Sequence, residues 1–216
     1  MKKQIITVMM VFLSCASISN AQLIKSYGIK VAYTATSQSL DYPTPPWGWW
    51  TGTTTSAKSG FNVAAFAEWL NIPFFSVVSQ VEYDQRGANA KYAVPGGWRT
   101  TDGSLQYLSV PIMAKVSIPT GLVSPYLLAG PRADFLFAYR ELGVQPWGNA
   151  TSLSFYSNFK RANLGASLGV GLETSSVFPA RLLAELRYNL DIFDSYNDGN
   201  LKSRNNAIDV WLGVAL

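Results

Sequence analysis

Residues 108–139, LSVPIMAKVSIPTGLVSPYLLAGPRADFLFAY, alternate apolar side chains with small, polar or charged ones. Val110, Ile112 and Val116 share one parity, while Ser109 and Lys115 fall on the other. A period of two indicates β-strands, because successive side chains of a strand point to opposite faces. Residues 119–124 separate two such runs, so the sequence predicts a hairpin whose two faces meet different environments.

The same alternation recurs along the chain in eight runs: 26–35, 62–69, 75–84, 108–118, 127–137, 163–173, 181–192 and 208–216. The connections at 70–73, 119–124 and 174–179 are short, and those at 37–59, 85–104, 140–161 and 194–206 are long and polar or rich in Gly and Pro. An even number of strands with short turns at one end and long loops at the other is typical of an outer-membrane barrel. We therefore predict an all-β, eight-stranded antiparallel up-and-down transmembrane β-barrel, with both termini beside the short turns on the periplasmic side.

The chain begins with MKKQIITVMMVFLSCASISNAQ. Lys2 and Lys3 precede a short apolar run, and small residues stand before Gln22. This pattern predicts a secretory signal peptide at residues 1–21, cleaved after Ala21, which leaves residues 22–216 as the barrel domain. Lipid attachment at Cys15 is a weaker alternative, because the residues before it match a lipidation signal poorly.

The composition excludes several classes of function. The chain has no histidine, so histidine metal ligands and histidine-based catalysis are absent. Its single cysteine, Cys15, leaves with the signal peptide, and loss of Lys2 and Lys3 lowers the formal charge from +4 to +2. A nearly neutral chain does not favour nucleic acid as a partner. We expect no enzyme activity, no cofactor and no metal.

The two faces of the strands decide between a membrane barrel and a soluble one. A soluble barrel turns its apolar face inward and needs a water-compatible outer face. Residues 163–173 present mostly Asn, Gly and Ser on their second face, which suits a crowded interior better than a solvated surface. The apolar face also carries aromatic residues near strand ends, as the interface girdles of outer-membrane barrels do: Tyr27, Trp69, Tyr83 and Phe137. The membrane barrel is the favoured interpretation, with outer-membrane lipid around it.

Charged residues on the second parity then face a closed lumen. A buried charge needs a partner, and an eight-stranded barrel has just enough room for its own side chains. We predict an interior ion-pair network in place of an aqueous path, which argues against a porin. The expected members are Lys30, Glu68, Glu82, Lys115, Arg132, Asp134, Glu173, Glu185, Arg187 and Asp209. Paired carboxylates for acid–base chemistry are a less favoured interpretation of the glutamates.

The segment LQYLSVPIMAKVSIPTGLVSPYLLAGPRADFLF resembles the signature of PorT-like outer-membrane β-barrel proteins, in which a short turn joins a YLxxP strand to PYLLAGP. SVVSQVEYDQRG, NLGASLGVGLE and LLAELRYNLDIFD are similar to other parts of that family. The resemblance implies an eight-stranded barrel in the outer membrane of a Gram-negative bacterium. It implies little about activity, although the member that names the family is an accessory of a protein secretion system.

The long loops are therefore the segments that we expect to carry the function. We predict a non-enzymatic envelope protein that acts structurally or through surface-loop contacts, with a role as a secretion-system accessory as the alternative. A small-ligand or pore function is a further alternative. The first loop contains DYPTPPWGWWTG, and an aromatic patch there could stack on a sugar or peptide. The candidate contact residues are Trp47, Trp49 and Trp50 of this loop, which Trp98 and Trp147 of the second and third loops could join if the loops converge. The sequence does not predict an oligomeric state.

Overall fold

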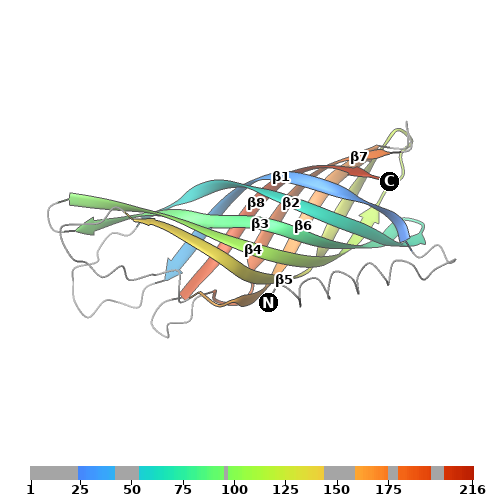
Figure 1. Cartoon of the computed structure of the whole chain (residues 1–216). Coiled ribbons are helices and arrows are strands. Elements are labelled where there is room, and N and C mark those ends of the chain that lie inside the picture. The colour runs from blue at the N-terminus through green and yellow to red at the C-terminus, as the bar shows by residue number, and fades with distance from the viewer. Residues whose placement is uncertain (1–23, 42–53, 95–96, 144–158, 175–179, 196–201) are drawn as a thin grey trace.

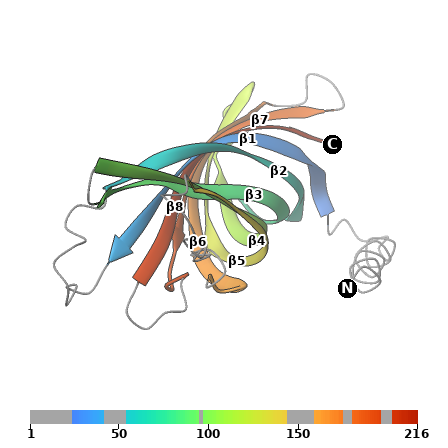
Figure 2. The same cartoon turned by 60° about the vertical axis from the view of Figure 1, so that its left-hand side comes forward.

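The computed structural model describes residues 24–41, 54–94, 97–143, 159–174, 180–195 and 202–216. These residues form a closed antiparallel barrel of eight strands in chain order, in agreement with the predicted fold class. The strands are β1 (Ile24–Asp41), β2 (Thr54–Ile72), β3 (Phe75–Val94), β4 (Gly97–Ser117), β5 (Val123–Gly143), β6 (Ala162–Thr174), β7 (Arg181–Asp191) and β8 (Lys202–Ala215). Figure 1 shows the barrel from the side, and Figure 2 shows it after a turn of 60°.

The first and last strands close the sheet. β1 pairs with β8 from Gly28 and Ala215 to Asp41 and Lys202. At the rim, the backbone nitrogen of Leu216 donates to the carbonyl of Tyr27 at 2.8 Å, and that of Tyr27 donates back at 3.2 Å. The beginning of β1 and the end of the chain therefore lie at the same end of the barrel. Among the described residues, no helix is long and apolar enough to cross a membrane.

The alternation seen in the sequence becomes an apolar outside and a polar inside. On β1, Ile29 is 65% exposed, whereas the next residue, Lys30, is 3% exposed. Aromatic side chains line the belt toward the long-loop end, where the ring centroids of Phe61 and Tyr83 lie 5.6 Å apart and those of Tyr83 and Phe137 lie 6.0 Å apart. A belt of exposed apolar side chains ending in aromatic residues is the lipid-facing surface expected of an outer-membrane barrel.

Several strands extend well beyond this belt, which corrects the predicted loop boundaries. β6 and β7 have 13 and 11 residues, close to the ~9–11 that a tilted strand needs to cross a bilayer. β4 and β5 each have 21 residues. As a result, most of the predicted loop at 85–104 is strand, since β3 runs to Val94 and β4 begins at Gly97. The predicted loops at 37–59, 140–161 and 194–206 also lose residues at their ends to β1, β2, β5 and β8.

The reason for this difference is that apolar alternation marks only the part of a strand that lies in lipid. Beyond the belt both faces of a strand meet polar surroundings, so the pattern disappears while backbone pairing continues. Asn89, for example, still pairs with Asp102. Trp98, which we expected in a loop, lies in β4 opposite Ala93. The other four predicted tryptophans, Trp47, Trp49, Trp50 and Trp147, lie outside the described residues.

The glycines of β6 allow its backbone to lie against bulky lumen side chains. A Cβ atom added at Gly171 would overlap the ring of Tyr126, and one at Gly165 would come within 2.9 Å of the Arg132 guanidinium. Because glycine has no side chain, these positions admit large neighbours into the interior.

Substitution of Gly171 by Ala tests this packing. We expect G171A to lower the free energy of unfolding by about 1–3 kcal/mol, because the added methyl must displace Tyr126 in a crowded interior. Urea unfolding in phospholipid vesicles, read from the mobility difference between boiled and unboiled samples on a gel, would measure it. G169A is the matched control, since the Cβ at Gly169 comes no closer than 3.2 Å to its nearest neighbour, the carbonyl oxygen of Leu186. Equal losses for both variants would contradict the role given to Tyr126.

Candidate functional site

The lumen holds the densest cluster of chemically active side chains in the described part of the chain. All ten of the predicted lumen residues lie there, each at most 7% exposed: Lys30, Glu68, Glu82, Lys115, Arg132, Asp134, Glu173, Glu185, Arg187 and Asp209. They come from all eight strands and share the inward parity. Their contacts divide into three levels along the barrel.

The level nearest the short turns is centred on Glu68. Its carboxylate accepts from Lys25 at 2.8 Å and lies 3.2 Å from the ammonium group of Lys115. Lys115 also reaches Glu173 at 2.6 Å, and the guanidinium of Arg181 lies 3.3 Å from the same carboxylate. Lys25 and Arg181 are partly exposed, so this level joins the buried network to the barrel rim.

The middle level is centred on Arg187. Its guanidinium lies 2.5 Å from Glu185 and 2.5 Å from Glu82, and it stacks 4.9 Å from the ring of Trp211. Glu185 accepts a second cation, Lys30, at 2.9 Å. A guanidinium fits between two carboxylates because its planar fork offers five donors in fixed directions.

The level toward the long loops brings two arginines together with three aspartates. Arg86 forms ion pairs with Asp84, with Asp134 at 2.9 Å and with Asp191 at 3.4 Å. Arg132 contacts Asp134 at 3.0 Å and Asp191 at 3.2 Å. Asp134 and Asp191 therefore each lie between two guanidinium groups. In this arrangement the buried negative and positive charges compensate one another.

Three members of this level were missing from the predicted network. Asp84 has the same parity as the predicted Glu82, and Asp191 has the same parity as the predicted Arg187, so the signal was present in the sequence. Arg86 also continues the inward parity of β3, but it stood beyond the predicted end of that strand. The error in the strand boundary therefore hid the cation on which this level is centred.

Asp209 differs from the other predicted residues because neutral groups bind it. Its carboxylate accepts from the hydroxyl of Thr34 at 2.6 Å and from the amide of Asn189 at 2.6 Å. Ser167 in turn donates to Asn189 at 2.6 Å, which fixes the orientation of that amide. Within the described ranges, no cluster of three or more His, Cys, Asp or Glu residues has the geometry of a metal site.

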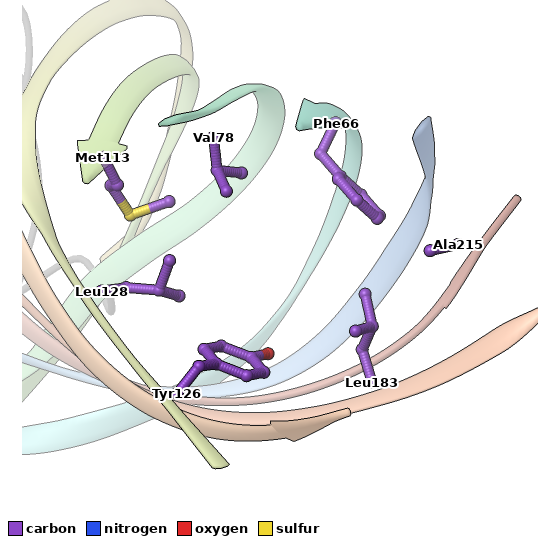
Figure 3. Packing of buried hydrophobic residues seen from close by; sticks show 7 residues of the cluster. All are labelled: Phe66, Val78, Met113, Tyr126, Leu128, Leu183 and Ala215. Atoms are coloured by element: carbon purple, nitrogen blue, oxygen red, sulfur yellow. The ribbon is translucent and has the colours of Figure 1, made fainter. Parts of the chain in front are cut away.

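Apolar side chains close the lumen between and beyond the charged levels. Figure 3 shows the group near the short turns, in which Phe66, Met113, Tyr126 and their neighbours point inward from the barrel wall. At the other end, Phe159 packs with Leu105 and Tyr107. Tyr107 also lies under Arg86, whose guanidinium is 4.8 Å from the ring centroid. The interior of the described barrel is thus filled by packed side chains and paired charges.

The fold is similar to that of known outer-membrane barrels. OprG from Pseudomonas aeruginosa is 10% identical, with a TM-score of 0.51 over 89% of this chain and 96% of that one. Neisserial surface protein A is 17% identical, with a TM-score of 0.45 over 87% and 96%. Ail of Yersinia pestis, solved with the heparin analogue sucrose octasulfate, is 15% identical, with a TM-score of 0.43 over 88% and 98%. At such low identity these likenesses concern the fold alone.

No curated protein matches the chain significantly by sequence. The model of one protein family, described as the outer membrane protein beta-barrel domain, matches residues 21–197. Assignment to the PorT-like subgroup stays a prediction, because the matching model describes the broader family. The apolar belt, the closed eight-stranded sheet and a family match over most of the sequence agree, and the chain belongs to the outer membrane protein β-barrel family as an integral outer-membrane protein.

Proposed function

We propose that this protein is a non-enzymatic scaffold of the outer membrane, which anchors an extended sheet at its long-loop end for contact with a protein partner. One observation carries the proposal. Charged levels and apolar clusters follow one another along the described lumen, while β2 to β5 continue about ten residues beyond the length that a membrane crossing needs. A sealed barrel transports nothing through its centre, so its specific surface lies where the strands leave the lipid.

The extended end has a distinct shape. Among the described residues, β1 and β2 stay paired only as far as Thr36 and Lys58. Beyond that point β1 remains paired with β8 up to Asp41, and the start of β2 remains paired with β3. The wall thus divides into a β8–β1 ribbon and a β2–β5 sheet, which diverge in both views of the barrel (Figures 1 and 2).

The surface of the extended end is polar where the belt was apolar. Ser37 and Ser39 of β1 are exposed there, at the parity of the outward Tyr33 farther down the strand, and Ser56 of β2 is exposed as well. Polar side chains lie here beside strand segments that have only one strand partner among the described residues. This suits a contact made in water, in which an extended segment of a partner pairs with a strand. This supports a protein partner over a lipid one at this end.

The orientation is part of the proposal. Outer-membrane barrels place short turns in the periplasm and long loops outside. Here the turns between β2 and β3 and between β4 and β5 are short, and both described chain ends lie at the same rim as those turns. The extended sheet then faces the cell exterior.

The geometry also supports a role without catalysis. Glu68, Glu82, Glu173 and Glu185 are each bound by at least one lysine or arginine and lie away from solvent. Glycosidase-type chemistry needs two carboxyl groups that a substrate can reach. In the described lumen these carboxylates are covered by their cationic partners and by packed apolar groups.

Site-specific photo-crosslinking in living cells tests the scaffold function. We expect a photoreactive residue at Ser39 or Ser56 to form adducts with protein, because both positions lie on the extended end. The same residue at Leu168, which is 58% exposed in the middle of the lipid-facing belt, is the control and should form no such protein adduct. Absence of adducts at both serines would contradict the proposal. An adduct with a secretion component, together with cargo lost from the medium of a deletion strain, would identify the accessory role.

The filled lumen predicts electrical silence. We expect the purified protein to produce no single-channel steps in planar lipid bilayers, because most charged groups inside are paired and apolar side chains pack between them. A water-filled porin incorporated under the same conditions is the positive control. Reproducible conductance steps from the folded protein would instead favour the pore alternative.

The ion-pair network predicts a large stability effect at Arg187. Replacing it by Leu leaves Glu82 without its guanidinium partner in a fully buried position. We expect R187L to lower the free energy of unfolding by about 3–5 kcal/mol. The matched control is R204L, which removes an ion pair with Asp194 from a side chain that is 56% exposed and should cost about 1 kcal/mol or less. Urea titration in vesicles measures both, and similar values would mean that the interior pairs contribute no more than surface pairs do.

A further inference from the structure

The lipid-facing surface near the short turns carries a groove with a volume of about 650 Å³. It crosses the outer surface from β4 to β8, and nearly all of the outward side chains that line it are branched aliphatic ones. Those side chains belong to Val116, Ile118, Pro125, Leu127, Val170, Leu172, Ala184, Leu186 and Val210. None of these outward side chains carries a charge or a hydrogen-bonding group. Four residues of the inward parity also line the groove: Tyr126, Gly171, Glu185 and Trp211.

The groove follows the pairing of the strands. Val116 is the cross-strand partner of Leu127, which pairs with Val170. Val170 in turn pairs with Leu186, and Leu186 with Val210. One row of partners therefore forms a continuous wall across five strands, and it runs obliquely through the membrane because the strands are tilted.

A second row forms the other wall and contains the small residues. Leu172 pairs with Pro125 on one side and with Ala184 on the other. Because Pro125 and Ala184 project little, this row is lower than the first at both positions. The depth of the groove thus depends on two compact residues between larger aliphatic ones.

Gly171, which also lines the groove, lies against a bulky side chain inside the barrel. Gly171 lies between Val170 and Leu172 on the inward face of β6, and the Tyr126 ring occupies the space that a side chain at Gly171 would need. The β6 backbone can therefore approach the lumen more closely than a strand with full inward side chains.

We propose that this groove binds one acyl chain of a phospholipid from the leaflet at the short-turn end. The groove opens into hydrocarbon, where no water is present to occupy it. An empty apolar groove would lose dispersion contacts along its walls. A lipid chain is the apolar partner that surrounds this surface in the outer membrane. Assignment to a phospholipid of the periplasmic leaflet rests on the proposed orientation, and the groove itself rests on the membrane location alone.

Native mass spectrometry of the full-length protein released from detergent tests the proposal. We expect the unaltered protein to retain one phospholipid, and A184F to retain about tenfold less, because a phenyl ring at Ala184 fills the groove. The matched control is A129F, since Ala129 faces lipid on β5 outside the groove and lies opposite Ala114 and Leu168. This control should retain lipid as the unaltered protein does. Folding of both variants is checked by the mobility difference between boiled and unboiled samples.

A second measurement does not depend on any variant. A phospholipid that carries a spin label on its chain should show a motionally restricted component of about one lipid per barrel beyond the general boundary lipid. Equal retention in A184F and A129F, or no retained lipid in the unaltered protein together with no such component, would overturn the proposal. Retention of lipopolysaccharide in place of phospholipid would overturn the assigned leaflet and the proposed orientation, while the photo-crosslinking result would still decide the scaffold function independently.

Discussion

Satisfaction of every backbone hydrogen bond within the sheet is the constraint on which this structure depends. Hydrocarbon offers no partner to a free N–H or C=O group, so strands can cross a membrane only when the sheet has no edge. The pairing of β1 with β8 supplies that closure here, and it continues to the rim through the contacts between Tyr27 and Leu216. Closure then divides each strand into one face toward lipid and one toward a narrow interior.

In the narrow interior, buried carboxylates need cationic partners, and the charged levels supply them. Arg187 joins Glu82 to Glu185, and Arg86 joins three aspartates, so that most buried carboxylates have a cation within contact distance. Apolar clusters pack beside these levels, and the Glu68 level reaches the rim at the short turns through Lys25 and Arg181. In the proposed function the barrel is a filled support, and the parts of its strands beyond the lipid and the shape of its outer wall supply the specific contacts.

The eight strands and their faces could be predicted because lipid and lumen impose opposite demands on alternate residues. The strand ends could not, because that alternation fades where the strands leave the membrane. Arg86 shows the consequence, since its parity was readable while the predicted end of its strand excluded it. The partner of each lumen charge could not be predicted from the sequence either. Lys30 and Glu185, for example, are separated by 155 positions and meet only through the register of the closed barrel.

The order of apolar and polar residues alone thus specified an eight-stranded barrel with charges inside, since a period of two leaves a strand little choice of face. Folding in three dimensions settled which charges pair, how far the sheet continues beyond the belt and where the wall is concave. These features depend on the register between strands distant in sequence and on the fit of single residues, such as Gly171 against Tyr126. No local pattern encodes them, because each requires two or more strands to be placed before the contact exists.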